Sequence, residues 1–339
     1  HTSRLFPVSR FALEQYLSYG SFGKVFLVKD TLDEGNYYAM KVMDKKHIAR
    51  NDKQIHTLAE RNTLVRLTHP FIVNLHYACQ TSNYLYLVLD YCKYGDCRLL
   101  LHTFTVAQKR VYAAEVCLAI GYLHEQDIVY RDLKPENILM DDEGHIRLTD
   151  FGLVKENVSA ASTGAKTFCG TPEYVAPEIL VARASDIPYG QDVDWWACGC
   201  LFYEMYVGTS PFYDEKRNHH RIYEAIQANN PKDYGIIKDE FTKTFIKGLL
   251  TSDPNSRLGH NGFKQDIQKN RFFKDIDWNT LMQRKWPANV DKPSRKLPVR
   301  QYLPDLKTNM ERQITADSLK GDKDYDYDDN HYDDYEYDQ

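Results

Sequence analysis

The most informative part of the sequence is residues 130–137 (YRDLKPEN), which is followed by residues 150–152 (DFG) and residues 176–178 (APE). Taken singly, charged side chains such as these belong on a solvated surface. Three motifs in a fixed order, with acidic, basic and amide side chains inside one short loop, instead indicate a reactive site.

Upstream, residues 20–25 (GSFGKV) form a glycine-rich segment between two expected strands. Glycine allows backbone amides to approach phosphate oxygens because it carries no Cβ. A glycine-rich hairpin alone is more often a tight turn, but Lys41 lies on the following expected strand and Glu60 in the helix after it. Together they indicate a nucleotide-binding segment.

The N-terminal part of the chain reads mainly as strands. Runs rich in β-branched and aromatic residues predict strands at residues 26–28, 37–43 and 85–90, with one helix at residues 53–67.

From Thr105 onward the pattern becomes helical. One buried helix face is predicted by the spacing of Val116, Ala119, Ile120 and Leu123. The apolar run at residues 193–203 predicts a buried helix, since a membrane span needs ~18 residues or more. Helical patterns continue to about residue 273, and the residues from 274 on are expected to lie as a strap over a surface.

Charge is unevenly distributed along the chain. The 339 residues carry a formal net charge of −5, but residues 321–339 contain nine acids and one base, which leaves 42 bases and 39 acids in the rest. A hydrophobic content of 42% predicts a globular body, with an acidic tail that behaves separately. The nearly neutral body, without a basic and aromatic patch, gives no support for nucleic-acid binding.

The seven cysteines are at positions 79, 92, 97, 117, 169, 198 and 200. Because they have neither the spacing of a zinc site nor that of a disulfide framework, we expect a reducing, cytoplasmic compartment, with the nucleus as a further location. The start shows no signal-peptide pattern. The chain begins with His1 rather than methionine, so we expect it to be a fragment.

The order of the motifs resembles the signature set of protein kinases, with Tyr130 in place of the usual histidine of the catalytic loop. Residues 167–174 (TFCGTPEY) and 193–196 (VDWW) are similar to the AGC group of serine/threonine kinases. Similarity to the protein kinase B and serum- and glucocorticoid-regulated kinase branch lies in residues 39–46, 59–62 and 150–156.

The resemblance implies an α+β, bilobal protein-kinase fold, in which a small β-rich N-lobe and a larger α-helical C-lobe are followed by an AGC-type C-terminal tail. The expected segments are a lead-in at 1–10, the N-lobe at 11–89, the C-lobe at 90–273, the AGC tail at 274–320 and the acidic tail at 321–339.

The resemblance also implies a catalytic role for each matching residue. Lys41 would bind the α- and β-phosphates of ATP, oriented by an ion pair with Glu60. Asp132 would accept the proton of the substrate hydroxyl, and Lys134 would steady the phosphoryl group. Phosphoryl transfer requires charge neutralisation and alignment, which these residue types supply.

ATP and Mg²⁺ are the implied cofactors. Asn137 and Asp150 would hold Mg²⁺, which prefers oxygen ligands. The other nucleotide contacts are expected from Gly20, Ser21, Phe22, Gly23, Val25, Ala39, Leu89, Asp90, Cys92, Asp96, Leu139 and Thr149.

Two departures from the family pattern stand out. Ser18 takes the place of the first loop glycine, so a Cβ there is expected to weaken nucleotide binding. Between Asp96 and Tyr112 the chain is a few residues shorter, which leaves the start of the local helix open.

Thr167 matches the activation-loop phosphorylation site of the family. A phosphate would add about −1.5 to −2 of charge and attract cations, for which Arg131, Lys155 and His56 are the expected partners. His56 lies one helical turn before Glu60. We therefore expect an upstream kinase to activate the protein through Thr167.

Protein substrates with basic motifs are the expected partners. Asp96, Glu136 and Glu204 match positions that bind arginines before the phosphorylated residue, since arginine and carboxylate pair through two hydrogen bonds. Thr171 would favour serine and threonine acceptors. Two alternatives remain: a pseudokinase that acts as a binding scaffold, which Ser18 suggests, and a small-molecule phosphotransferase.

Structural roles are expected for three further residues. Glu178 would pair with Arg257, and Asp194 would anchor the backbone of the catalytic loop.

The acidic tail has the aromatic spacing of a family segment that docks on the small lobe, at Tyr332, Tyr335 and Tyr337. Glu336 stands at the place of a phosphorylated residue in that segment. The docking site would lie near Lys45 and Leu85. The alternative for this tail is a disordered acidic segment.

Overall fold

The computed structural model describes residues 8–20, 23–33, 35–50, 54–158, 164–185, 187–293 and 310–312. Ser21, Phe22 and the aromatic segment at residues 332–337 lie outside these ranges. The described residues group into two compact units, which fall within residues 1–50, 77–88 and 301–339 (unit 1) and residues 51–76 and 89–300 (unit 2).

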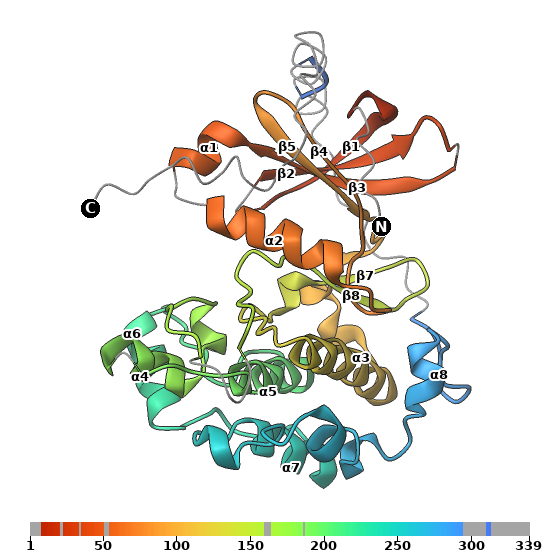
Figure 1. Ribbon diagram of the computed structural model, residues 1–339. Helices are drawn as coiled ribbons and strands as arrows, with labels where there is room; N and C mark the ends of the chain where they lie inside the picture. Colours follow the sequence, from red (N-terminus) through yellow and green to blue (C-terminus); the bar gives the residue numbers. More distant parts are fainter. Residues whose placement is uncertain are drawn as a thin grey trace. The chain divides into compact units, whose positions relative to one another are not determined.

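A five-stranded sheet with the order β1-β2-β3-β5-β4 carries most of unit 1. Its strands, drawn in red and orange in Figure 1, are β1 (Phe11–Gly20), β2 (Gly23–Asp30), β3 (Tyr37–Asp44), β4 (Leu75–Gln80) and β5 (Tyr84–Asp90). The strands predicted at residues 26–28, 37–43 and 85–90 are confirmed. Sequence patterns did not single out β4.

One face of this sheet is covered by a hydrophobic core. The core is formed by Val8, Phe11, Leu13, Phe26, Val28, Met40, Val42, Tyr86, Val88 and Met310. Met310 is far from the others in the sequence and only 3% exposed. The chain beyond residue 300 therefore contributes to the core of unit 1.

A short helix, α1 (Lys45–Arg50), follows β3. Asp44 starts it, because its Oδ1 accepts hydrogen bonds from the backbone amides of Lys46 and His47 at 2.8 and 3.1 Å. Six residues are too few to show a helical period, which explains why the sequence did not predict this helix.

Helices carry unit 2. They are α2 (Gln54–Arg66), α3 (Val106–Glu125), α4 (Pro177–Ser185), α5 (Asp192–Val207), α6 (His219–Gln227), α7 (Glu240–Leu249) and α8 (Trp278–Met282). The helices predicted at residues 53–67 and 193–203 are confirmed. None of the helices in the described part of the chain is long and apolar enough to cross a membrane.

Helix α3 begins where the sequence pattern changes. Thr105 caps it, since its side chain accepts a hydrogen bond from the amide of Gln108 while the Gln108 side chain accepts one from the amide of Thr105. Its predicted face is buried, with exposed fractions of 0–1% at Val116, Ala119, Ile120 and Leu123. The shortened segment before α3 holds two single 3-10 turns, Cys97–Leu99 and Leu101–Thr103.

A small sheet in unit 2 has the order β6-β7-β8. It consists of β6 (Gly95–Asp96), β7 (Ile138–Met140) and β8 (Ile146–Leu148). Strand β7 starts directly after Asn137, and β8 ends just before Thr149. The sheet therefore fixes the end of the loop that carries Asp132 and the start of the segment that carries Asp150.

The expected strap lies against unit 2 in its described part. Arg284 donates to the carbonyl of Pro70 at 2.7 Å and pairs with Glu143 at 2.9 Å, and Trp286 Nε1 donates to the carbonyl of Glu143 at 3.2 Å. These contacts join residues far apart in the sequence.

Candidate active site

Val25, Ala39 and Lys41 share one face of the sheet in unit 1. In the antiparallel register Val25 lies opposite Lys41, and Leu27 lies opposite Ala39. Residues that are directly opposite or two positions apart point to the same side of a sheet. Phe26, which is offset by one position, points into the core on the other face. These three predicted nucleotide contacts are therefore brought together.

The glycine-rich segment starts and ends at a paired position, Gly20 opposite Gly23. A Cβ on Gly23 would lie 2.2 Å from the carbonyl oxygen of Val42, so only glycine fits there. Ser18 lies within β1 opposite Val25, and it is not among the described residues with positive φ. Strand backbone of this kind accepts a Cβ without strain.

Leu89 and Asp90 end strand β5, and the Asp90 side chain is fully engaged within unit 2. Its carboxylate accepts hydrogen bonds from the amide and the side chain of Asn74, both at 2.9 Å, and lies 2.7 Å from His76 Nε2. Burial opposes its ionisation, yet His76 and Arg147 hold the pKa of Asp90 below its usual value. The Asp90 side chain is therefore held by its neighbours in unit 2.

Three predicted nucleotide contacts lie at the small sheet. Cys92 precedes β6, Asp96 is in β6 and Leu139 is in β7. The Cys92 carbonyl accepts a hydrogen bond from the amide of Gly95 at 3.1 Å, which turns the chain into β6. There Asp96 pairs with Leu139 across β6 and β7.

Asp194, at the start of α5, anchors the catalytic loop as predicted. Its two carboxylate oxygens accept hydrogen bonds from the amides of Tyr130 and Arg131, each at 2.8 Å, and His124 Nε2 lies 2.8 Å from it. Asp194 is fully buried. These bonds hold Arg131 at a φ of 69°, a strained value for a side chain of this size.

Asp132 lies at the centre of a cluster of predicted site residues. Its Oδ2 accepts hydrogen bonds from Lys134 Nζ at 2.7 Å and Asn137 Nδ2 at 2.9 Å. Its Oδ1 accepts one from Thr171 Oγ1 at 3.3 Å. Thr171 belongs to the activation segment (residues 150–178). This contact therefore joins that segment to the catalytic loop (residues 130–137).

The environment of Asp132 also shifts its acidity. Burial raises the pKa of the Asp132 carboxyl, while the Lys134 ammonium lowers it and the Asp150 carboxylate raises it. Asp150 therefore lies close enough to interact by charge, and its φ of 60° places it in the left-handed region. Thr149, which precedes it, is tied to the loop by a 3.0 Å hydrogen bond from its amide to the carbonyl of Asn137.

These residues fit a magnesium ion. Two neighbouring carboxylates repel one another unless a cation lies between or beside them. The Asn137 side chain donates to Asp132 through its amide nitrogen, and its amide oxygen is a ligand type that Mg²⁺ takes. Oxygen ligands of this kind are what Mg²⁺ prefers, together with phosphate oxygens.

Glu60 is 1% exposed on helix α2, and a carboxylate so deeply buried requires a partner. Helix α2 is tied to the segment after residue 152, because Thr63 donates to Glu156 at 2.7 Å and Arg66 pairs with Glu156 at 2.6 Å. The pairing of Glu60 with Lys41 would join the two units and stays a prediction.

Tyr189 links the expected regulatory residues, although no sequence motif singled it out. Arg131 Nη1 donates to the Tyr189 hydroxyl at 3.1 Å, and this hydroxyl donates to the carbonyl of Thr167 at 2.6 Å. Arg131 Nε donates to the carbonyl of Leu153 at 2.6 Å. Thr167 and Lys155 are exposed. Of His56, only its position in α2 is described.

Gly170 allows the activation segment to pass close to the catalytic loop. Its φ is 105°, which favours glycine, and a Cβ would lie 3.1 Å from the carbonyl oxygen of Arg131. This explains a glycine three residues after Thr167.

The predicted arginine-binding acids lie in a common electrostatic environment. Burial raises the pKa of Glu204, which accepts a hydrogen bond from the Tyr174 hydroxyl, and the charge of Glu136 raises it further. Asp96 and Glu136 are both close to Arg98, a residue that sequence reasoning missed.

The predicted structural pair of Glu178 and Arg257 is confirmed. Arg257 Nη2 donates to Glu178 Oε2 at 2.9 Å, and the Arg257 side chain is fully buried. The pair fixes the end of the activation segment to the helical part of unit 2.

Comparison with known proteins agrees with this geometry. The protein kinase domain family matches residues 11–273. The chain is 42% identical over 296 residues to the serine/threonine-protein kinase Sgk1 of Xenopus tropicalis, covering 84% of this chain and 68% of that one. It is 42% identical over 275 residues to the serine/threonine-protein kinase sgk-1 of Caenorhabditis elegans, covering 79% and 57%.

A further relative is the RAC family serine/threonine-protein kinase homolog of Dictyostelium discoideum, 42% identical over 285 residues, with 83% of this chain and 61% of that one covered. The chain thus spans 57 to 68% of the length of these three relatives. It belongs to the protein kinase family, with the predicted α+β fold, in the branch of AGC serine/threonine kinases that contains the Sgk and RAC kinases.

Proposed function

We propose that the chain transfers the γ-phosphate of Mg-ATP to serine and threonine hydroxyls of protein substrates. The observation that carries this proposal is the Asp132 carboxylate, which side chains of Lys134, Asn137 and Thr171 hold at 2.7, 2.9 and 3.3 Å. A carboxylate so positioned can accept the proton of a substrate hydroxyl. Lys134 stands beside it as the cation for the transferred phosphoryl group.

Asn137 and Asp150 would hold Mg²⁺, which neutralises charge on the β- and γ-phosphates when it is bound. Val25, Ala39 and the backbone near Asp90 and Cys92 would bind the base of ATP. Lys41, on the same sheet face as Val25, would bind the phosphates. Phosphorylation of Thr167 would raise activity, since Tyr189 already links its backbone to Arg131.

Basic sequences are the proposed substrates. Asp96, Glu136 and Glu204 supply carboxylates for arginines that precede the acceptor. Cations in the substrate would relieve the repulsion that raises the pKa of Glu204.

The test is phosphate transfer from Mg-ATP to three peptides that differ only in a serine, threonine or tyrosine acceptor within a basic sequence. We expect transfer to serine and threonine, and none to a small alcohol. Binding of Mg-ATP without transfer would instead identify a pseudokinase scaffold. Transfer to the small alcohol but to no peptide would identify a small-molecule phosphotransferase.

A further inference from the structure

Arg98 lies two residues after Asp96 and is close to two of the three carboxylates that are proposed to bind substrate arginines, those of Asp96 and Glu136. Arg98 Nε is 4.0 Å from Asp96 Oδ1, and Arg98 Nη1 is 3.8 Å from Glu136 Oε1. Two carboxylates that converge on one guanidinium have the arrangement needed to recognise an arginine.

Local structure brings these three residues together. Asp96 caps the 3-10 turn Cys97–Leu99, because its Oδ1 accepts a hydrogen bond from the amide of Arg98 at 3.2 Å. The pairing of Asp96 with Leu139 places this turn against the one that carries Glu136. Arg98 is therefore fixed at its backbone, while its side chain is 53% exposed.

We propose that Arg98 occupies the place of the substrate arginine and thereby sets how strongly the protein prefers basic substrates. This inference rests on the proposed function and identifies a specificity-determining residue within it. While Arg98 is in place, the two carboxylates present a net charge of about −1 rather than −2 to an incoming peptide.

The geometry indicates that Arg98 can be displaced. At 3.8 and 4.0 Å its nitrogens are beyond hydrogen-bond distance of both carboxylates, and pairs between exposed side chains contribute little to stability. A substrate arginine can form two charge-assisted hydrogen bonds at shorter distance. Arg98 therefore weakens the preference for arginine without abolishing it.

The test uses the full chain phosphorylated at Thr167, and serine peptides with a single arginine placed in turn at each position before the acceptor, against the peptide with glutamine throughout. For Arg98→Gln we expect kcat/KM for the best arginine peptide, relative to the glutamine peptide, to rise about two- to fivefold over wild type. The gain should appear in KM. Arg98→Lys should return the ratio toward that of wild type.

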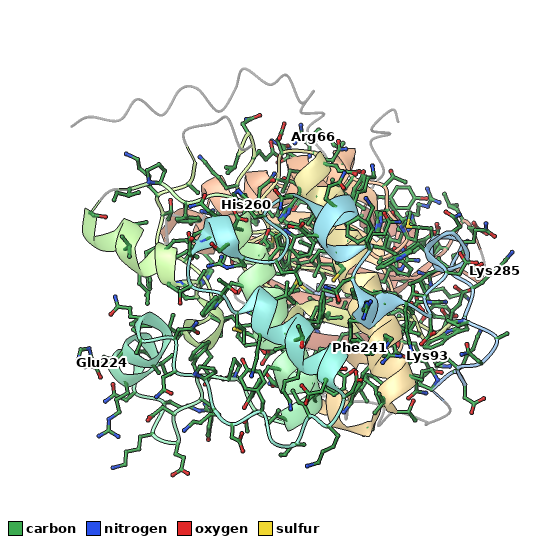
Figure 2. All side chains as sticks on the ribbon, turned by 90° about the horizontal axis from the view of Figure 1, so that it is seen from below. Arg66, Lys93, Glu224, Phe241, His260 and Lys285 are labelled. Carbon is green, nitrogen blue, oxygen red and sulfur yellow. The ribbon has the colours of Figure 1, made fainter. Side chains whose placement is uncertain are left out.

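Lys93→Gln is the matched control, because it removes the same charge nearby. Lys93, which is labelled in Figure 2, is exposed and pairs with neither carboxylate among the described contacts. An equal rise in this control would contradict the inference, since the effect would then be general electrostatics. An unchanged ratio in Arg98→Gln would also contradict the inference. A loss of activity in Arg98→Gln together with a lower unfolding temperature would contradict it as well, because it would indicate a structural role.

The failure of the proposed function would look different. If wild type phosphorylates the peptides but neither it nor Arg98→Gln distinguishes arginine from glutamine, the acids do not bind arginine, and both proposals are wrong. If wild type prefers arginine and Arg98→Gln does not change that preference, only the inference about Arg98 is wrong.

Discussion

The activation segment is held at Thr171 and at Glu178 by contacts of different construction. At Thr171, the segment donates a hydrogen bond to the Asp132 carboxylate, which the side chains of Lys134 and Asn137 also bind. At Glu178, the segment pairs with Arg257. Arg257 also donates hydrogen bonds to the backbone carbonyls of Thr251 at 2.8 Å, Asp192 at 2.9 Å and Ser252 at 3.1 Å.

The two cations differ in exposure. The Lys134 side chain is 23% exposed and that of Arg257 is 0% exposed, whereas the carboxylates of Asp132 and Glu178 are 7% and 16% exposed. Removing one partner of a pair that is closed to solvent leaves a buried charge without compensation and destabilises the fold. The Asp132 carboxylate is also buried, but its partners are side chains, one of them a partly exposed lysine, and a substrate hydroxyl can replace a side-chain partner. Four predictions test this distinction.

The largest effect is expected from Asp132→Asn. The amide keeps the shape of the side chain but cannot accept the proton, so we expect kcat to fall by ~10²–10⁴-fold. Affinity for Mg-ATP, measured by nucleotide titration, should change little. A kcat within a few-fold of wild type would contradict the role of Asp132 as the base.

Arg257→Met should act on stability. Removing one partner of a buried pair leaves the other charge without compensation, so we expect the free energy of unfolding to fall by about 3–5 kcal/mol. Chemical denaturation measures this change. The control is Arg66→Met, because Arg66, labelled in Figure 2, pairs with Glu156 but its side chain is 60% exposed. Its loss should cost about 0–1 kcal/mol, and equal losses would contradict the distinction.

Thr167→Ala should lower activity through the residues around Asp132. A phosphate on Thr167 would attract Arg131, which is adjacent to Asp132, so its absence should reduce kcat/KM by about 5- to 150-fold. Phosphatase treatment of wild type should produce a similar loss and leave Thr167→Ala unchanged. Full activity of the alanine variant would show that this phosphorylation is not required.

The smallest effect is a shift in pH dependence. Burial raises the pKa of Asp132, and a base must be deprotonated to act, so activity should be lost on acidification at a higher pH than for an exposed aspartate. Because the Lys134 ammonium lowers this pKa, Lys134→Met should move the acidic limb of kcat/KM to still higher pH. Lys134→Arg should keep the limb in place. A limb at lower pH in Lys134→Met would contradict the assignment.

Long helices could be predicted from the sequence, and short helical segments could not. Helix α3 was predicted from its apolar spacing and its start at Thr105, because a helix of twenty residues repeats its pattern several times. Helix α1 has six residues and depends on a single Asp44 cap. The two 3-10 turns before α3 are too short to show any period.

The candidate site divides in a similar way. Asp194, Glu178 and Arg257 were assigned correctly because each belongs to a motif with a fixed spacing. Tyr189 and Arg98 were missed. Tyr189 is distant in sequence from Arg131 and Thr167, and only folding places its hydroxyl between them. The proposed role of Arg98 depends on its closeness to Glu136, which the pairing of β6 with β7 brings near.

The distinction between the Asp132 and Arg257 contacts of the activation segment is tested by measuring kcat and the unfolding midpoint on the same preparations of Asp132→Asn and Arg257→Met. We predict that Asp132→Asn loses ~10²–10⁴-fold in kcat with an unchanged midpoint. Arg257→Met should lose about 3–5 kcal/mol of stability while its folded fraction still transfers phosphate. A parallel loss of both quantities in both variants would contradict this account.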